Sequence, residues 1–191
     1  MSLAERIALV NEKIAAAARQ AGREPSEVTL VAATKVQTSD TIRQAIAAGV
    51  TICGENRVQE MTAHLDDDAY AGAALHFIGH LQTNKVRQVV GRVELIESVG
   101  SEHLLEAIEA QAAKLELVQD ILLEVNIGGE ASKSGISPEE LSALAAQAEK
   151  SVDIDGLLAL AASAPALDAA APALPPPVEG RPRIAVARDK A

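Results

Sequence analysis

One lysine, Lys35, lies where a buried strand is predicted to end. It follows Thr34 and the apolar run 28–33, whose β-branched residues predict a strand. A lysine at the apolar mouth of a barrel has its pKa lowered by desolvation, and its neutral amine forms an imine with a carbonyl compound. The alternative is an exposed lysine at a strand end. Position alone favours this alternative, because most lysines lie at the surface.

Asn56 and Gly79 follow the next two predicted strands. Gly54, Glu55 and Asn56 come directly after the strand predicted at 51–53. The glycine permits close backbone approach, and the Asn56 amide both donates and accepts hydrogen bonds. Gly79 follows the strand predicted at 75–78 and would leave room above a barrel. The alternatives are an Asn56 cap on the next helix and an ordinary capped turn at Gly79.

Asn126 follows a further predicted strand, at 121–125, and precedes a glycine-rich loop. The loop, residues 128–135, reads GGEASKSG. Its glycines would let backbone N–H groups converge on an anion that Lys133 also faces. The alternative is a flexible, solvated loop.

The other chemically versatile side chains predict no second site. His76 and His80 would lie about 13 Å apart on a strand, and no Cys or carboxylate nearby in the sequence completes a ligand set, so no metal site is expected. Cys53 lies in an apolar run and is expected in the core. Tyr70 lies in an acidic stretch and is expected to be exposed.

Strand and helix patterns alternate along the chain. Strands are predicted at residues 28–33, 51–53, 75–78, 93–97, 121–125 and 154–160, all parallel, with helices between them. Polar residues follow most of these strands, which favours a TIM-type (β/α) barrel over a doubly wound sheet, because every strand of a barrel contributes to the site. Neither glycine-rich nucleotide fingerprint occurs. The expected fold class is therefore α/β, an incomplete TIM-type barrel with six of eight βα units recognisable.

The end of the chain breaks this pattern. Most of the eight prolines lie in residues 163–191, and proline is excluded from helix interiors and central strands. We expect a barrel domain over residues 1–162 and a Pro/Ala-rich, atypical tail over residues 163–191.

Composition excludes several classes of function. A net charge of −10 disfavours nucleic-acid binding, and 1% aromatic residues leave no base-stacking platform. No apolar run is long enough to span a membrane, and the N-terminus does not resemble a signal peptide. A single cysteine fits a reducing compartment. We expect a cytoplasmic protein, a monomer or a weak homo-oligomer, that binds neither nucleic acid nor membrane.

Five segments together resemble one family. They are LVAATK ending at Lys35, CGENRVQE (53–60), HFIGHLQTNK (76–85), LLEVNIGGEASKSGI (122–136) and IDGLLALA (154–161). These resemble the motifs of the pyridoxal 5′-phosphate homeostasis proteins, which are related in fold to the N-terminal barrel of alanine racemase. The resemblance covers residues 1–162.

The resemblance implies pyridoxal 5′-phosphate held as an imine on Lys35, in a pocket to which we assign Asn56, Gly79 and Asn126. It implies a role in vitamin B6 homeostasis without established turnover, so no enzyme activity is expected. The chain departs from the family pattern at His80, where proline is frequent. It also departs after residue 162, where the loops that would hold the phosphate have no counterpart.

Two alternatives remain open at the level of sequence. One is a cofactor-free, truncated remnant that acts as a binding or scaffold protein. The other is a Schiff-base aldolase, which also uses a barrel lysine. The aldehyde found as an imine on the lysine distinguishes them: pyridoxal phosphate indicates the homeostasis protein, a sugar-phosphate aldehyde indicates the aldolase, and no imine indicates the scaffold protein.

Overall fold

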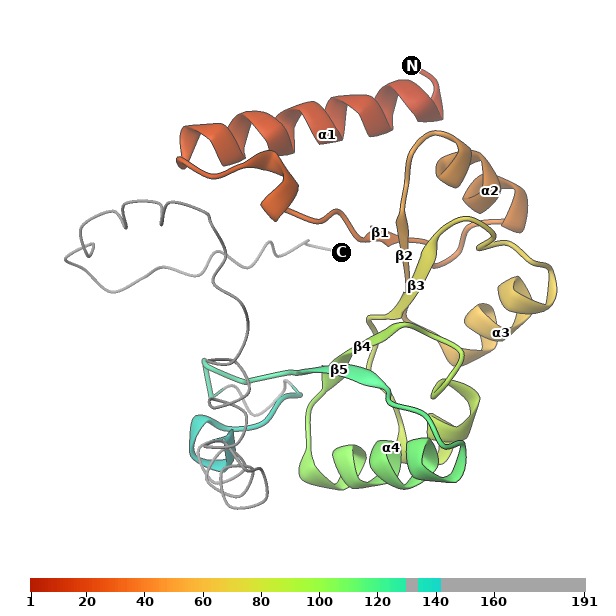
Figure 1. Ribbon diagram of the computed structural model, residues 1–191, viewed down its shortest axis with the longest axis vertical. Helices are drawn as coiled ribbons and strands as arrows, with labels where there is room; N and C mark the ends of the chain where they lie inside the picture. Colours follow the sequence, from red (N-terminus) through yellow and green to blue (C-terminus); the bar gives the residue numbers. More distant parts are fainter. Residues whose placement is uncertain (130–133, 142–191) are drawn as a thin grey trace, which may run out of the picture. The chain divides into compact units, whose positions relative to one another are not determined.

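The strands of the chain run parallel and pair in the order of the sequence. The computed structural model describes residues 1–129 and 134–141, which all belong to the first of two units, residues 1–148 and 149–191. Within it the order is α1 (Leu3–Gln20), η1 (Pro25–Glu27), β1 (Ala32–Ala33), α2 (Ser39–Ala47), β2 (Ile52–Glu55), α3 (Val58–Asp66), β3 (Ala74–Phe77), η2 (Thr83–Gln88), β4 (Leu95–Val99), α4 (Glu102–Lys114) and β5 (Asp120–Leu123) (Figure 1). The sheet order is β1-β2-β3-β4-β5, every pair parallel. This sequential order is that of a barrel and not of a sheet with a switch point.

Side-chain caps define where the helices begin. Ser2 and Glu5 form the predicted capping box at α1, Thr38 caps α2 and Ser101 caps α4. A second predicted box, between Ser137 and Glu140, is also present. Each cap satisfies N–H groups that have no partner in the first helical turn.

Three elements differ from the prediction. β1 has two residues instead of six, because it is an edge strand that pairs only with β2 in the described part of the chain. β2 extends to Glu55, so Gly54 and Glu55 belong to the strand and not to the turn after it. The segment predicted as a helix at 84–90 is the 3₁₀ helix η2, a geometry common in short connectors. The sixth predicted strand, 154–160, lies outside the described residues.

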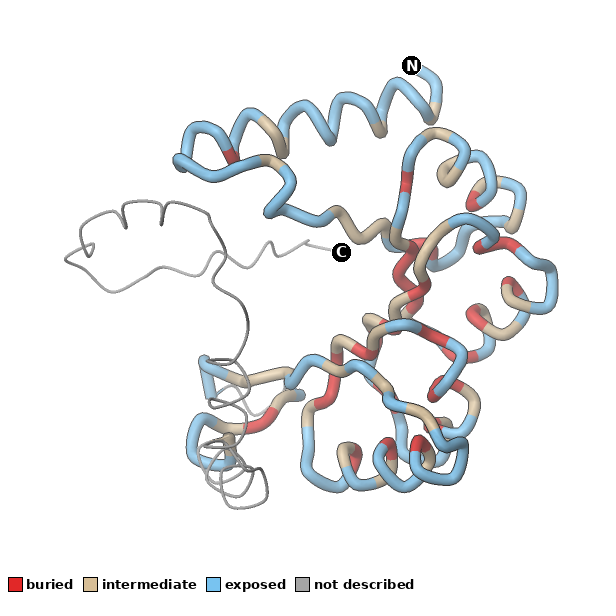
Figure 2. The backbone as a smooth tube through the Cα atoms, in the orientation of Figure 1, coloured by how far each residue is buried: buried red, intermediate tan, exposed pale blue. Residues whose placement is uncertain are grey.

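The core lies between the sheet and the helices on its outer face. Cys53, Leu75, Phe77 and Ile96 point outward from β2, β3 and β4 and are buried. Figure 2 shows this buried backbone along the strands, whereas α1 is exposed over most of its length. The apolar residues of α1 therefore form a helix face that the other described residues cover only in part.

The inner face of the sheet is less covered. Gly54 pairs with His76, His76 with Leu95, and Leu95 with Asp120, so these four residues share that face. His76 and Leu95 are half-buried, and Asp120 is exposed. None of the described helices is long and apolar enough to cross a membrane.

Candidate functional site

Lys35 lies in a tight turn at the carboxyl end of β1. The Gln37 N–H donates to the Thr34 carbonyl at 3.1 Å, which closes the turn over residues 34–37. Val36, between them, has φ 57°, a left-handed conformation that is unfavourable for a β-branched residue. Lys35 is exposed, which agrees with the alternative of an exposed lysine at a strand end that its position alone favoured.

Thr34, the residue before Lys35, lies in the layer between the sheet and the helices. Thr34 is buried, and its Oγ1 donates to Glu55 Oε1 at 2.7 Å. Glu55 has 0% of its surface exposed, although an unpaired carboxylate in an apolar layer is strongly unfavourable. The charge therefore needs hydrogen-bond donors around it.

Tyr70 and His64 both lie against the same oxygen of Glu55. Tyr70 Oη donates to Glu55 Oε1 at 2.8 Å, and His64 Nδ1 lies 3.2 Å from the same oxygen. Tyr70 is 6% exposed, so its predicted exposure is wrong: this hydrogen bond draws the end of the acidic stretch into the core. Burial, and secondly the bond to Glu55, raises the pKa of Tyr70 well above its usual value.

Asn56 and Gly79 are in direct contact at the ends of β2 and β3. A Cβ at Gly79 would lie 2.5 Å from Asn56 Cα, so only glycine fits there. The expected free space above Gly79 is instead filled by this contact. Asn56 does not cap α3, whose N-cap is Arg57. Within the described residues, the buried Asn56 Oδ1 has no hydrogen-bond partner.

Asn126 lies further along the same edge of the sheet. The Asn126 N–H donates to the Ile136 carbonyl at 2.9 Å, in a parallel bridge between Val125 and Ile136. A hollow of about 470 Å³ lies beside it, between Gly129 and Pro138. Lys133 of the predicted anion loop lies outside the described residues.

A second hollow, of about 420 Å³, joins the loops after β3 and β4 to residues 134–135. His80 and Gly135 both line it, and Gly135 packs against Asn126. Along this edge, Gly79 therefore packs against Asn56, Gly135 packs against Asn126, and the hollow lies between His80 and Gly135. Lys35 lies at the same edge, at the end of β1.

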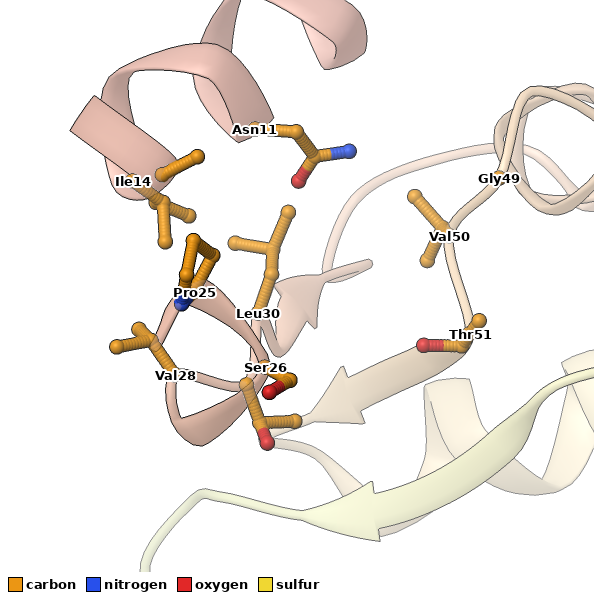
Figure 3. A pocket seen from close by; sticks show the side chains of 11 residues that line it. Asn11, Ile14, Pro25, Ser26, Val28, Leu30, Gly49, Val50 and Thr51 are labelled. Carbon is orange, nitrogen blue, oxygen red and sulfur yellow. The ribbon is translucent and has the colours of Figure 1, made fainter. Parts of the chain in front are cut away.

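A separate cavity lies at the opposite, amino-terminal end of β1 and β2. It measures about 450 Å³, and Asn11, Ile14, Leu30 and Thr51 are among its lining residues (Figure 3). None of its lining residues is titratable. It offers no amine, acid or base, so the predicted chemistry does not belong there.

Two histidine–carboxylate contacts were missed from the sequence. His76 Nδ1 lies 2.7 Å from Glu97 Oε1 on the inner face, so a carboxylate does lie near His76, contrary to the sequence argument. The other contact is that between His64 and Glu55. Alternation along β2 could have indicated Glu55, since a strand that buries Cys53 points Glu55 to the same face. No group of three potential metal ligands occurs among the residues described.

Known proteins resemble the chain over most of its length. The family model for the alanine racemase N-terminal domain matches residues 10–174. The chain is 40% identical over 144 residues to the pyridoxal phosphate homeostasis protein of Aquifex aeolicus, covering 75% of this chain and 63% of the relative. It is 35% identical to that of Pseudomonas aeruginosa, covering 83% of this chain and 70% of the relative.

A solved structure agrees as well. PipY of Synechococcus elongatus, without PLP, superposes with a TM-score of 0.67 at 32% identity, covering 76% of this chain and 64% of PipY. PipY has also been solved with PLP bound. The chain spans less than two thirds of the length of the Aquifex protein and of PipY. The barrel fold, the order of the strands and these identities agree: the chain belongs to the alanine racemase N-terminal domain family and, within it, to the pyridoxal phosphate homeostasis proteins.

Proposed function

We propose that this chain binds pyridoxal 5′-phosphate through Lys35 and contributes to vitamin B6 homeostasis. When bound, the cofactor supplies an aldehyde that condenses with a primary amine and releases one water molecule. Lys35 supplies that amine from an exposed turn at the carboxyl end of β1, the end at which barrels of this type carry their sites.

The observation that carries the proposal is the unpaired amide oxygen of Asn56. It is buried at the end of β2 and lacks a hydrogen-bond partner within the described residues. At the carboxyl end of a barrel strand, where sites of this fold lie, such an atom is expected to meet a polar ligand group, because buried acceptors are normally satisfied. Gly79 holds the Asn56 backbone in place by contact. The names of the curated relatives, and PipY with PLP bound, support the same ligand.

We further propose that the chain does not turn over amino acids. Tyr70, the sole tyrosine, is bound to Glu55 behind the sheet, on the face opposite to the inner one. It therefore cannot act as the acid or base of a racemase at Lys35. Alanine racemisation should not exceed the rate given by free pyridoxal phosphate.

A visible absorption titration tests cofactor binding. Adding pyridoxal phosphate to the full chain should produce the band of a lysine-bound cofactor, and Lys35→Ala should lose it. Lys85→Ala, which removes an amine from η2, serves as a control and should keep it. An unchanged band in Lys35→Ala would contradict the proposal.

The alternatives predict different results in the same titration. A Schiff-base aldolase would bind a sugar-phosphate aldehyde through Lys35 in preference to pyridoxal phosphate. A cofactor-free scaffold protein would show no band with either compound. The cytoplasmic location, the monomeric or weakly oligomeric state and the boundary at residue 162 remain part of the proposal.

A further inference from the structure

The turn that carries Lys35 is held at both of its ends by one buried pair of side chains. At the start of the turn, Thr34 Oγ1 donates to Glu55 Oε1 at 2.7 Å. At its end, the Gln37 carbonyl accepts from His64 Nε2 at 3.1 Å. Glu55 and His64 in turn contact each other at 3.2 Å. These contacts form a closed loop from the turn through β2 and α3 and back to the turn.

The middle of the turn is held by α3 as well. The Val36 N–H donates to Glu60 Oε2 at 3.0 Å, and Arg57 donates to Glu60 Oε1 at 3.0 Å. The hydrogen bond from Val36, together with Arg57, keeps the pKa of Glu60 below its usual value. Val36 itself is 79% exposed. Its left-handed backbone is therefore maintained by these polar contacts and not by packing of its side chain.

The hydrogen atoms on His64 follow from its partners. Nε2 faces a carbonyl oxygen, which only accepts, so Nε2 carries a hydrogen. Nδ1 lies 3.1 Å from Tyr70 Oη and 3.2 Å from Glu55 Oε1. With a second hydrogen on Nδ1, His64 is a cation against the Glu55 carboxylate. Without it, Nδ1 accepts the single hydrogen of the Tyr70 hydroxyl, which then no longer donates to Glu55. The bond from His64 to the Gln37 carbonyl is present in both arrangements.

We propose that Glu55 and His64 are positioning residues for Lys35: together they fix the turn over residues 34–37 and so determine where the Lys35 amine is presented. Neither side chain needs to reach the cofactor, since both lie on the outer side of the sheet. The inference rests on the proposed function only in naming Lys35 as the reacting amine.

Thr34 offers the sharpest variant, because removing Glu55 itself risks unfolding the core. Thr34→Val keeps the shape of the side chain and removes the hydroxyl that donates to Glu55 at 2.7 Å and to the Gly54 carbonyl at 3.2 Å, whereas Thr34→Ser restores a hydroxyl. His64→Gln cuts the opposite end of the loop. Thr62→Val is a matched control on α3, because the buried Thr62 Oγ1 has no hydrogen-bond partner within the described residues.

Two readouts are needed: amide hydrogen exchange without ligand, and uptake of pyridoxal phosphate followed by absorbance. In Thr34→Val and His64→Gln, protection at the Val36 and Gln37 amides should fall about tenfold, the size expected for one lost hydrogen bond to a charged group. The amides of β3 should keep their protection. Cofactor affinity should fall by a similar factor. Thr34→Ser should recover both quantities, and Thr62→Val should match the unsubstituted chain.

Unchanged protection of the turn amides in both Thr34→Val and His64→Gln would overturn the inference. An equal loss of protection in β3 would also overturn it, since the role would then be one of general stability. So would a loosened turn with unchanged cofactor affinity. If the unsubstituted chain binds no cofactor through Lys35, the proposed function fails, whereas the exchange data still decide whether Glu55 and His64 hold the turn.

Discussion

At the scale of single residues, the buried outer face of β2 controls the reactivity of the Cys53 thiol. Cys53 and Glu55 both point outward from β2 and both are 0% exposed. Burial, and secondly the charge of Glu55, raises the pKa of the Cys53 thiol to about 11 from a usual value of 9.0. Cys53 is therefore a neutral thiol of the core in the physiological pH range, as predicted from its apolar surroundings.

This pKa predicts how stability depends on alkaline pH. Between pH 9 and about 11 the unfolded chain releases the Cys53 proton while the folded chain keeps it. The contribution is thus complete below pH 9 and is lost as the pH rises towards 11, by about 1.4 kcal/mol per pH unit at most. Urea unfolding at pH 8, 9 and 10 should show a steeper decline for the unsubstituted chain than for Cys53→Ala. Equal slopes would contradict the raised pKa.

Gly79 and Gly54 are both closely surrounded, but by different kinds of atoms. A Cβ at Gly79 would meet the Asn56 backbone, whereas a Cβ at Gly54 would meet the ends of the Ile78 and Val31 side chains. Side-chain ends can rotate away and a backbone cannot, so Gly79→Ala should destabilise the fold more than Gly54→Ala. The expected cost for Gly79→Ala is about 1–3 kcal/mol, measured by urea unfolding. A larger cost for Gly54→Ala would show that the Asn56 contact is less rigid than the structure indicates.

At the scale of elements, the turn between β1 and α2 has a strained backbone that contacts with neighbouring elements stabilise. Val36 has φ 57° and Glu116, after α4, has φ 54°. Both are exposed, so glycine at either position should relieve backbone strain without loss of packing. Val36→Gly and Glu116→Gly are each expected to raise the free energy of unfolding by about 1 kcal/mol.

The two variants should differ in cofactor binding. Val36→Gly favours the left-handed backbone of the turn that carries Lys35 and should strengthen pyridoxal phosphate binding, whereas Glu116→Gly should leave it unchanged. Calorimetric titration of both variants measures this. Equal affinities would mean that the conformation of the turn does not matter for binding.

The elements that the sequence predicts well are those with local signals at their ends. The Ser2 and Ser101 side chains cap their helices by accepting from N–H groups three residues later. Hydrogen bonds between residues so near in the sequence can be predicted from residue spacing. The length of β1 could not be predicted from the sequence, because it depends on how many strands pair beside it. The burial of Tyr70 could not be predicted either, since it arises only when β2, α3 and the turn after α3 come together at Glu55.

The candidate site was predicted to a similar extent. Strand ends brought Asn56, Gly79 and Asn126 to one edge, as expected from parallel strands. The detailed contacts, such as Gly79 against the Asn56 backbone, depend on the register of β2 and β3, which the sequence does not specify to the residue. The assignments of Lys35, Asn56, Gly79 and Asn126 to cofactor binding stay predictions.

At the scale of the whole molecule, the 144 residues of the chain that match its Aquifex relative cover 63% of that relative's length. The family resemblance assigns the cofactor phosphate to loops after the seventh and eighth strands, and residues 163–191 show no matching motif. Each hydrogen bond to a charged group contributes about 1.5–3 kcal/mol, so without about three of them binding should be weaker by about three to six orders of magnitude. The chain should therefore bind pyridoxal phosphate weakly and prefer it little over pyridoxal.

A segment exchange tests this expectation. Replacing residues 163–191 with the corresponding C-terminal segment of the Aquifex protein should tighten binding and make it depend on the phosphate. A glycine–serine segment of equal length is the control and should not. Tight, phosphate-dependent binding by the unaltered chain would show that another part of the protein anchors the phosphate.

The most direct test of the central claim is to identify the residue that takes the cofactor. Borohydride reduction of the full chain with pyridoxal phosphate, followed by peptide mass mapping, reports the modified lysine. The account predicts a label at Lys35, at the end of β1, and its loss in Lys35→Ala. A label confined to Lys13, Lys85, Lys114 or Lys133 would contradict it.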